Sequence, residues 1–405
     1  MESPSPESNQ LRFPLLAKPA QLERVLGKIL DDDGVPRRMP VREWWGILEE
    51  LDRLRKFGKE EWPESLRDCV KKLLEMTLRF TRPDGSCVFG GEAPPENRAT
   101  TLRRWAEFLD DPGIGAISRW WFTRRGKRGE VGPPPLPAYG SETSAFAMLR
   151  SNWRVDGDFV GIDHRGATPS TTFELHANGA RLLGPSWDAN DGATGPAKLT
   201  GYGTDPMADW AEWRFPVGTA KVARLAVFLR SRHLAILADE WQGFEGKASQ
   251  KIALAKDVTV KPIAESRALL LKAPGVSARV IPLGLPSLPY PTERGSFQEE
   301  AGHLVLNQNS ESKRSWLPLV VSWDKERNRR PITWRVLTVS ERSKACPRDV
   351  AFAARLSWGP GDGLVVYRSL ARPKTRVFLG HQTSSRFMVG LFNETGDVVP
   401  LLSLD

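Results

Sequence analysis

The stretch GPPPLP, residues 132–137, separates two parts of the chain whose apolar residues follow different periods. Proline fixes φ and lacks an amide hydrogen, so this stretch cannot continue a helix and predicts a linker or a stiff extended connection. A basic run, RRGKRG at residues 124–129, comes just before it. We therefore expect a basic, proline-rich linker at residues 124–138, with a domain on either side.

Upstream of the linker, the apolar residues recur with the period of a helix. Positions i, i+3, i+4, i+7 and i+8 of the first such segment are Leu22, Val25, Leu26, Ile29 and Leu30. Similar helical patterns return in further segments, at residues 44–54, 66–77, 99–109 and from 114 onward. These patterns predict a helical domain over residues 20–123, preceded by a flexible N-terminus at residues 1–19.

Downstream of the linker, the apolar period changes to two. Short apolar runs alternate with Gly, Pro, Asn and Asp, for example at residues 159–162, 171–175, 222–229, 317–321 and 364–367. Many short strands with turn residues between them are typical of an antiparallel sandwich. We expect a large antiparallel β-sandwich domain over residues 139–405, so the predicted fold class is α+β with two domains.

The composition is that of a globular protein with an excess of positive charge. The 405 residues carry a net charge of +9, and most of the excess lies downstream of residue 138. The three cysteines, Cys69, Cys87 and Cys346, are odd in number and lack CxxC spacing, which argues against a disulfide framework or a zinc cluster. Glycine-rich phosphate-binding motifs and HExxH are also absent from the sequence. We expect neither a metal nor a cofactor.

The N-terminus, MESPSPESNQ, has acidic and polar residues where a signal peptide has a basic and then an apolar segment. The longest apolar runs are far shorter than the roughly 20 residues of a membrane-spanning helix. A cytoplasmic location without membrane contact is therefore the default expectation. A misassigned start codon would instead allow a periplasmic or secreted protein.

Several stretches resemble the heparinase II/III-like polysaccharide lyases. Residues 144–153, SAFAMLRSNW, are similar to the entry strand of that family's β-sandwich, and residues 171–183, TTFELHANGARLL, match its element FEL-x-A-x-G-x-x-LL. Upstream, TRPDGS at residues 81–86 is similar to the last helical turns of the family's α/α-toroid. The clear match covers about residues 140–185. The resemblance implies an α/α-toroid, here truncated, packed on an antiparallel sandwich, and eliminative cleavage of acidic polysaccharides.

Two departures from the family pattern bear on activity. The family places a histidine-rich element, HGHAD, before the FEL strand, and it supplies a catalytic histidine and metal ligands. Here residues 165–169 read RGATP, so both histidines and the aspartate are missing, although His164 lies one residue upstream. Only about 120 residues precede the sandwich, too few for a full toroid. We therefore expect an eroded active site that retains at most carbohydrate or polyanion binding.

The candidate site residues come from the resemblance and from the loop expected at residues 184–202. Of the five histidines, His164 stands where a predicted strand gives way to a glycine turn, so it and Tyr202 are the candidate acid and base. Candidate substrate contacts are Arg150, Arg165 and Trp187.

Two alternatives stay open: an active divergent lyase acting on uronate-containing polysaccharide, and a structural or interaction protein with a basic sandwich surface. The expected partner is an acidic polysaccharide or oligosaccharide rather than nucleic acid. The sequence leaves the oligomeric state open.

Overall fold

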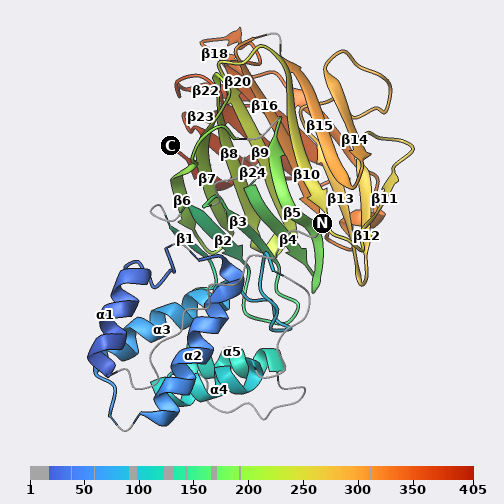
Figure 1. Ribbon diagram of the computed structural model, residues 1–405. Helices are drawn as coiled ribbons and strands as arrows, with labels where there is room; N and C mark the ends of the chain where they lie inside the picture. The colour runs from blue at the N-terminus through green and yellow to red at the C-terminus, as the bar shows by residue number, and fades with distance from the viewer. Residues whose placement is uncertain are drawn as a thin grey trace, which may run out of the picture. The chain divides into compact units, whose positions relative to one another are not determined.

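A computed structural model describes residues 18–37, 39–58, 60–90, 98–122, 132–141, 145–165, 171–190, 193–310 and 312–405 (Figure 1). The chain divides into two compact units: a helical unit of residues 1–137 with 153–155, and a sheet unit of residues 138–152 with 156–405. Residues 1–17 and 123–131 lie outside the described residues, so the flexible N-terminus and the basic part of the linker stay predictions.

The described part of the helical unit has five α-helices and one 3₁₀ turn: α1 (Pro19–Ile29), η1 (Val41–Glu43), α2 (Trp44–Phe57), α3 (Glu64–Arg79), α4 (Arg98–Leu109) and α5 (Pro112–Phe122). The spacing seen in the sequence explains their packing, because residues of α3 such as Leu66, Val70 and Leu73 share one face and are fully buried. They pack with apolar residues of the other four helices in one core. Trp45 Nε1 donates a hydrogen bond of 2.9 Å to Thr81 Oγ1 in this core.

The described residues of the sheet unit form four antiparallel sheets. The first sheet has the order β1 (Tyr139–Ser141), β2 (Phe146–Arg150), β3 (Phe159–Asp163), β4 (Thr171–Ala177), β5 (Ala180–Ala189), β10 (Gly246–Leu254), β15 (His303–Ser310) and β14 (Gly295–Glu300). The second has the order β11 (Thr259–Pro262), β12 (Leu269–Ala273), β13 (Val276–Pro282), β16 (Arg314–Ser322), β9 (Leu234–Gln242), β8 (Ala220–Leu229), β7 (Ala208–Val217) and β6 (Lys198–Thr204). The third has the order β17 (Thr333–Leu337), β20 (Ala351–Ser357), β21 (Gly363–Ser369), β24 (Phe387–Phe392) and β25 (Val398–Leu404). The fourth has the order β19 (Lys344–Ala345), β18 (Ser340–Glu341), β22 (Arg376–Phe378) and β23 (His381–Thr383).

The second sheet is covered on both faces. In β8, Val222, Ala226 and Phe228 pack into a core shared with the first sheet, whereas Leu225 and Val227 pack into a core shared with the third sheet. A strand buried on both faces has a nearly continuous apolar sequence, and in residues 222–229 only Arg224 interrupts it. The prediction of an α+β fold with an antiparallel sandwich is confirmed, and the structure adds a third layer to the expected two.

The segment 184–202, expected to be a loop, is mostly strand. It continues β5 to Ala189 and enters β6 at Lys198. Gly184 and Pro185 suggested a loop, but they lie where the pairing of β5 with β10 shifts register, between Trp187 and Leu183. A bulge of this kind accommodates glycine and proline within a strand. Among the described residues, no helix has the length and apolar character needed to cross a membrane.

Candidate functional site

His164 lies directly after β3 and faces the core between the first and second sheets. Its Nδ1 is 3.1 Å from Thr171 Oγ1, and its ring centroid is 5.3 Å from that of Trp213 and 5.5 Å from that of Phe215. The Nε2 atom is buried and has no hydrogen-bond partner among the described residues. Burial, reinforced by the nearby positive charge of Arg224, holds the pKa of His164 well below its usual value of 6.5.

Thr171 links His164 to a buried ion pair between the two sheets. Arg224 of β8 forms a two-pronged salt bridge with Asp239 of β9, with Nε–Oδ1 and Nη2–Oδ2 both at 2.8 Å. Neither side chain has exposed surface. Arg224 Nη1 also donates to Thr171 Oγ1 at 2.6 Å and to the carbonyl of Trp187 at 2.5 Å. The guanidinium therefore joins β8 and β9 to β4 and β5 across the core.

Trp187 belongs to this buried network. It has no exposed surface, and its ring packs edge to face against Phe173 at 5.3 Å. The guanidinium of Arg224 lies 4.3 Å above the indole centroid, a cation–π contact. Trp187 thus stabilises a buried cation, and in this structure it offers no face on which a sugar ring could stack.

The two arginines predicted to bind substrate lie on β2 and just after β3, which pair with each other. Arg165 is engaged by Asp163, with Nε–Oδ1 at 3.0 Å and Nη2–Oδ2 at 2.7 Å, and packs over the Phe146 ring. Arg150 is 1% exposed and lies 4.7 Å above the centroid of Phe159.

Tyr202, the candidate partner of His164, lies on β6 of the second sheet. Its ring packs tightly against Gly140 of β1, where an added Cβ would meet ring atoms at 2.5 Å. The structure therefore brings His164 and Trp187 together through Thr171 and Arg224, and it places Tyr202 against β1. Residues 166–170, which include most of the positions of the expected histidine-rich element, lie outside the described residues.

A second histidine, which the sequence did not single out, is paired with a buried carboxylate. His233 Nδ1 is 2.9 Å from Asp158 Oδ2, and Trp323 Nε1 donates to the same oxygen at 2.9 Å. The hydrogen bond to Asp158, together with its charge, raises the pKa of His233. Because the two residues lie 75 positions apart in the sequence, no local sequence motif indicates that they pair. The part of the chain that the structure describes holds no cluster of three or more metal-ligating side chains.

No protein-family model and no curated protein matches the chain. Among solved structures, it is similar to a heparinase III, with a TM-score of 0.66 and 12% identity, over 83% of this chain and 59% of that one. It is also similar to the heparan sulfate lyase HepC from Pedobacter heparinus, with a TM-score of 0.66 and 13% identity, over 95% of this chain and 62% of that one. The chain has the fold of heparinase-like polysaccharide lyases and spans about three fifths of the length of these structures.

Proposed function

We propose that this chain is a heparinase-like protein that binds acidic polysaccharide without cleaving it, because its lyase site is eroded. Eliminative cleavage needs a base that reaches the proton beside the uronate carboxylate and a group that neutralises that carboxylate. The observation that carries the proposal is the position of His164, which is half-buried and whose Nε2 is buried beside Trp213 and Phe215.

The arginine beside His164 supports the same proposal. Arg165 would be the neutralising group of a lyase, but its guanidinium already faces both carboxylate oxygens of Asp163. A uronate would have to displace this local pair, which also packs on Phe146. Positioned this way, Arg165 stabilises the end of β3 more readily than it binds a substrate.

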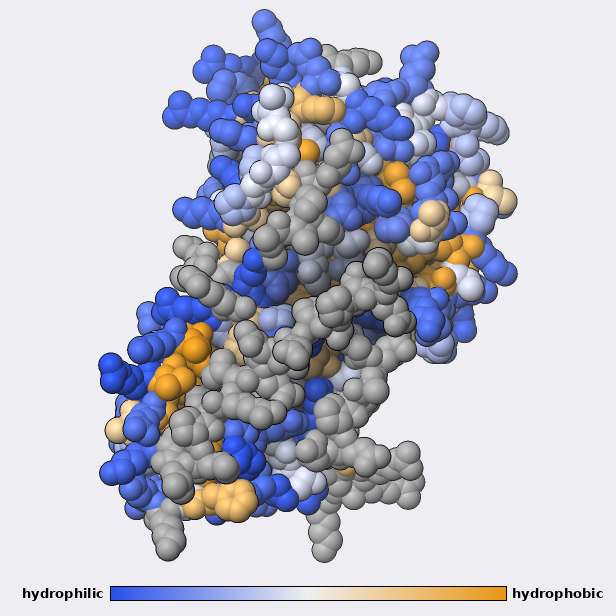
Figure 2. All heavy atoms as spheres, in the orientation of Figure 1, coloured by the Kyte–Doolittle hydropathy of each residue, from blue (hydrophilic) through white to orange (hydrophobic). Residues whose placement is uncertain are grey.

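Binding of an acidic polymer is supported by charge and by the fold. The net charge of +9 attracts polyanions at a distance, and the visible face of the sheet unit is mostly hydrophilic (Figure 2). The solved structures that share the fold are named for heparin or heparan sulfate. We extend that ligand class, acidic polysaccharide, to this chain.

The test measures binding and cleavage on the same samples. Heparin, heparan sulfate and alginate are incubated with the protein, retention is measured by affinity electrophoresis, and the ultraviolet absorbance of unsaturated product is followed. Binding that weakens as salt is raised, with no product, is the expected result. Absence of binding to every polymer would overturn the proposal in favour of an interaction protein with another partner.

An active divergent lyase is the second candidate, and one observation favours it. An imidazole held neutral, with one nitrogen free of hydrogen bonds among the described residues, has the protonation state of a general base. Unsaturated product that disappears in His164→Gln but persists in His176→Gln would establish this candidate and contradict the proposed loss of catalysis.

A further inference from the structure

The fourth sheet covers only one end of the outer face of the third sheet. At that end, Tyr367 of β21 and Met388 of β24 pack in one core with Phe378 of β22. At the other end, Thr333 and Arg335 of β17 are exposed. Because β17 is also an edge strand of the third sheet, this end of the face is accessible from the side as well.

Two arginines lie directly opposite each other at the open end. In the pairing of β17 with β20, Arg335 is the partner of Arg355. Residues directly opposite in an antiparallel pair have Cβ atoms roughly 4.5–5.5 Å apart, and like charges at such positions repel each other. Burial, and then the nearby charge of Arg335, lower the pKa of Arg355. Among the described residues, neither arginine has an ion pair or a side-chain hydrogen bond.

The surroundings of this arginine pair do not supply a counter-ion. Its neighbours on the same face of β17, β20 and β21 are apolar or carry a hydroxyl group: Thr333, Leu337, Ala353, Ser357 and Val365. Carboxylates lie further along, at the turn between β20 and β21. There, Asp362 accepts hydrogen bonds from Arg327, and Glu394 Oε1 lies 2.6 Å from the position of a Cβ added at Gly361. Within the part of the chain that the structure describes, the two charges of the pair are therefore not neutralised.

The Phe392 ring orients one member of the pair. The Cζ atom of Arg355 lies 3.7 Å from the centroid of Phe392 on β24, a cation–π contact. A guanidinium stacked on a ring keeps its N–H donors at its edge, where they can bind an anion in the guanidinium plane. Thr333 and Ser357, opposite each other two residues along the same strands, add hydroxyl groups beside the pair.

We propose that Arg335 and Arg355 bind one oxyanion, a sulfate or carboxylate group, of an acidic polysaccharide that lies along the open end of the third sheet. The oxyanion lies between the two guanidinium groups and cancels their repulsion, and Thr333 and Ser357 exchange hydrogen bonds with sugar hydroxyl groups. Arginine is suited to this role because its planar fork matches such anions. The choice of a polysaccharide rests on the proposed function, whereas the oxyanion and its location rest on the arginine pair.

The test compares two double variants that remove the same charge. Arg335→Gln/Arg355→Gln removes the arginine pair, and the control Lys256→Gln/Lys261→Gln removes two exposed lysines of the same unit that lie outside the third sheet. Apparent dissociation constants for heparan sulfate and for alginate are measured by affinity electrophoresis. We expect the arginine variant to bind heparan sulfate at least about tenfold more weakly than the wild type, and the control less than about twofold more weakly.

The two polymers distinguish the kinds of oxyanion. A loss with heparan sulfate alone would assign the pair to sulfate, and a loss with both polymers would extend the assignment to carboxylate. Equal losses in the two double variants, or unchanged binding of heparan sulfate in the arginine variant, would overturn the arginine pair as the site.

Two further variants separate recognition from folding and from charge. Arg335→Gln alone keeps Arg355 stacked on Phe392, so denaturant unfolding should match that of the wild type while heparan sulfate binding weakens at least about threefold. Arg335→Lys/Arg355→Lys keeps both charges but lacks the planar forks, so it should also bind more weakly than the wild type. Wild-type affinity in this charge-retaining variant would contradict recognition by the guanidinium groups.

Inorganic sulfate separates this inference from the proposed function. The midpoint of thermal unfolding is measured in sodium sulfate and in sodium chloride of equal ionic strength, for the wild type and for Arg335→Gln/Arg355→Gln. A larger rise with sulfate in the wild type, with no polymer bound, would support the arginine pair as an oxyanion site and overturn the proposed function. Heparan sulfate bound equally by both proteins would leave the proposed function standing and overturn the pair as its site.

Discussion

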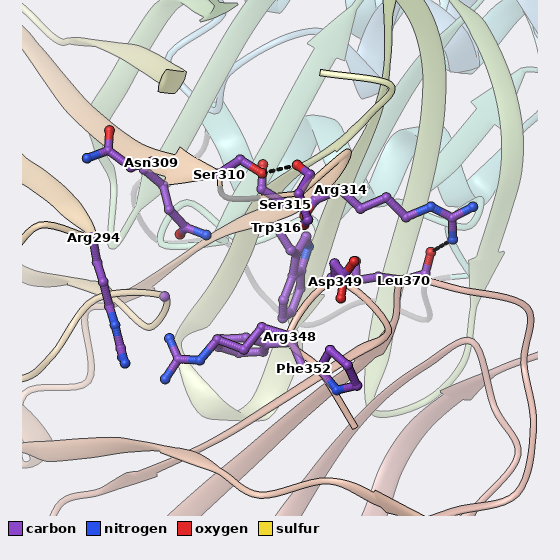
Figure 3. A pocket seen from close by; sticks show the side chains of 14 residues that line it. Arg294, Asn309, Ser310, Arg314, Ser315, Trp316, Arg348, Asp349, Phe352 and Leu370 are labelled. Atoms are coloured by element: carbon purple, nitrogen blue, oxygen red, sulfur yellow. Dashed lines mark hydrogen bonds between the residues drawn. The ribbon is translucent and has the colours of Figure 1, made fainter. Parts of the chain in front are cut away.

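Arg224 and Arg294 are both arginines of the sheet unit, but the structure places them in opposite settings. Arg224 is fully buried, paired with Asp239 through two hydrogen bonds, and in contact with the indole of Trp187. Arg294 is exposed and lines a cavity of the same unit (Figure 3). A charge that is paired inside the protein holds strands and sheets together, whereas an exposed charge is stabilised by water.

Among the described residues, buried arginine–carboxylate ion pairs lie on both faces of the second sheet. On the face opposite to Arg224, Arg368 of β21 bridges Glu212 of β7 at 3.0 Å and Glu240 of β9 at 2.5 Å. Arg386 adds a further bond of 2.7 Å to Glu212. Hydrogen bonds from Arg224 thus join the second sheet to the first, and ion pairs of Arg368 join it to the third. We assign both clusters to the relative placement of the sheets.

The largest expected effect comes from breaking the Arg224–Asp239 pair. Asp239→Asn leaves a buried guanidinium without its counter-ion, so the free energy of unfolding should fall by about 3–5 kcal/mol. Denaturant unfolding followed by tryptophan fluorescence measures this. The double variant Arg224→Met/Asp239→Leu removes both charges and should recover a large part of the loss. A loss below about 1 kcal/mol in Asp239→Asn would contradict the role given to this pair.

A smaller effect is expected from Arg386→Met in the cluster on the opposite face. Glu212 keeps its bond to Arg368, so only one of its charged partners is lost. The free energy of unfolding should fall by about 1.5 kcal/mol, the contribution of a hydrogen bond to a charged group. The same denaturant titration measures it. A loss as large as that of Asp239→Asn would contradict the expectation that Arg368, the remaining partner of Glu212, compensates for the lost bond.

A further effect, slightly smaller per pH unit, is the dependence of stability on pH that comes from His164. Its pKa in the folded protein lies well below 6.5, so below pH 6.5 the unfolded chain takes up a proton that the folded protein does not. Stability is therefore lost as the pH falls, by up to about 1.4 kcal/mol per pH unit. His164→Gln should weaken the dependence of the free energy of unfolding on pH below pH 6.5. An unchanged acid side would contradict the burial of this imidazole.

His233 provides the matched control for this measurement. Its raised pKa has the opposite sign, so its contribution is present below the unfolded pKa and is lost as the pH rises through the folded value. The ring is 46% exposed, which screens the effect to below about 1 kcal/mol. His233→Gln should therefore change the free energy of unfolding near neutral pH and leave its dependence on pH at acid pH as it is in the wild type.

Periodicity predicted much of the fold, because each unit repeats one simple pattern. Apolar spacing in segments such as residues 66–77 matches α3, and short alternating runs match strands such as β3 and β21. The third layer was not foreseen, because the short apolar runs within residues 351–369 resemble those of the strands in the first two layers. The strands around Gly184 were taken for a loop, since a bulge and a loop use the same residues.

The site was harder to predict, because its groups meet only in space. In the run KVARLAVFL, residues 221–229, nothing distinguishes Arg224 as a buried cation rather than a solvated one. The partners Asp158 and His233 lie 75 residues apart.

The most direct test is the titration of His164 itself. Protein with ¹³C,¹⁵N-labelled histidine is followed by NMR while the pH is lowered from above 6.5 to well below it, and His164→Gln assigns the resonances. We expect the His164 imidazole signals to show no titration around pH 6.5, because desolvation holds the pKa of this ring well below that value. A titration with a midpoint near 6.5 would contradict the buried network and return His164 to the role of a solvent-accessible acid and base.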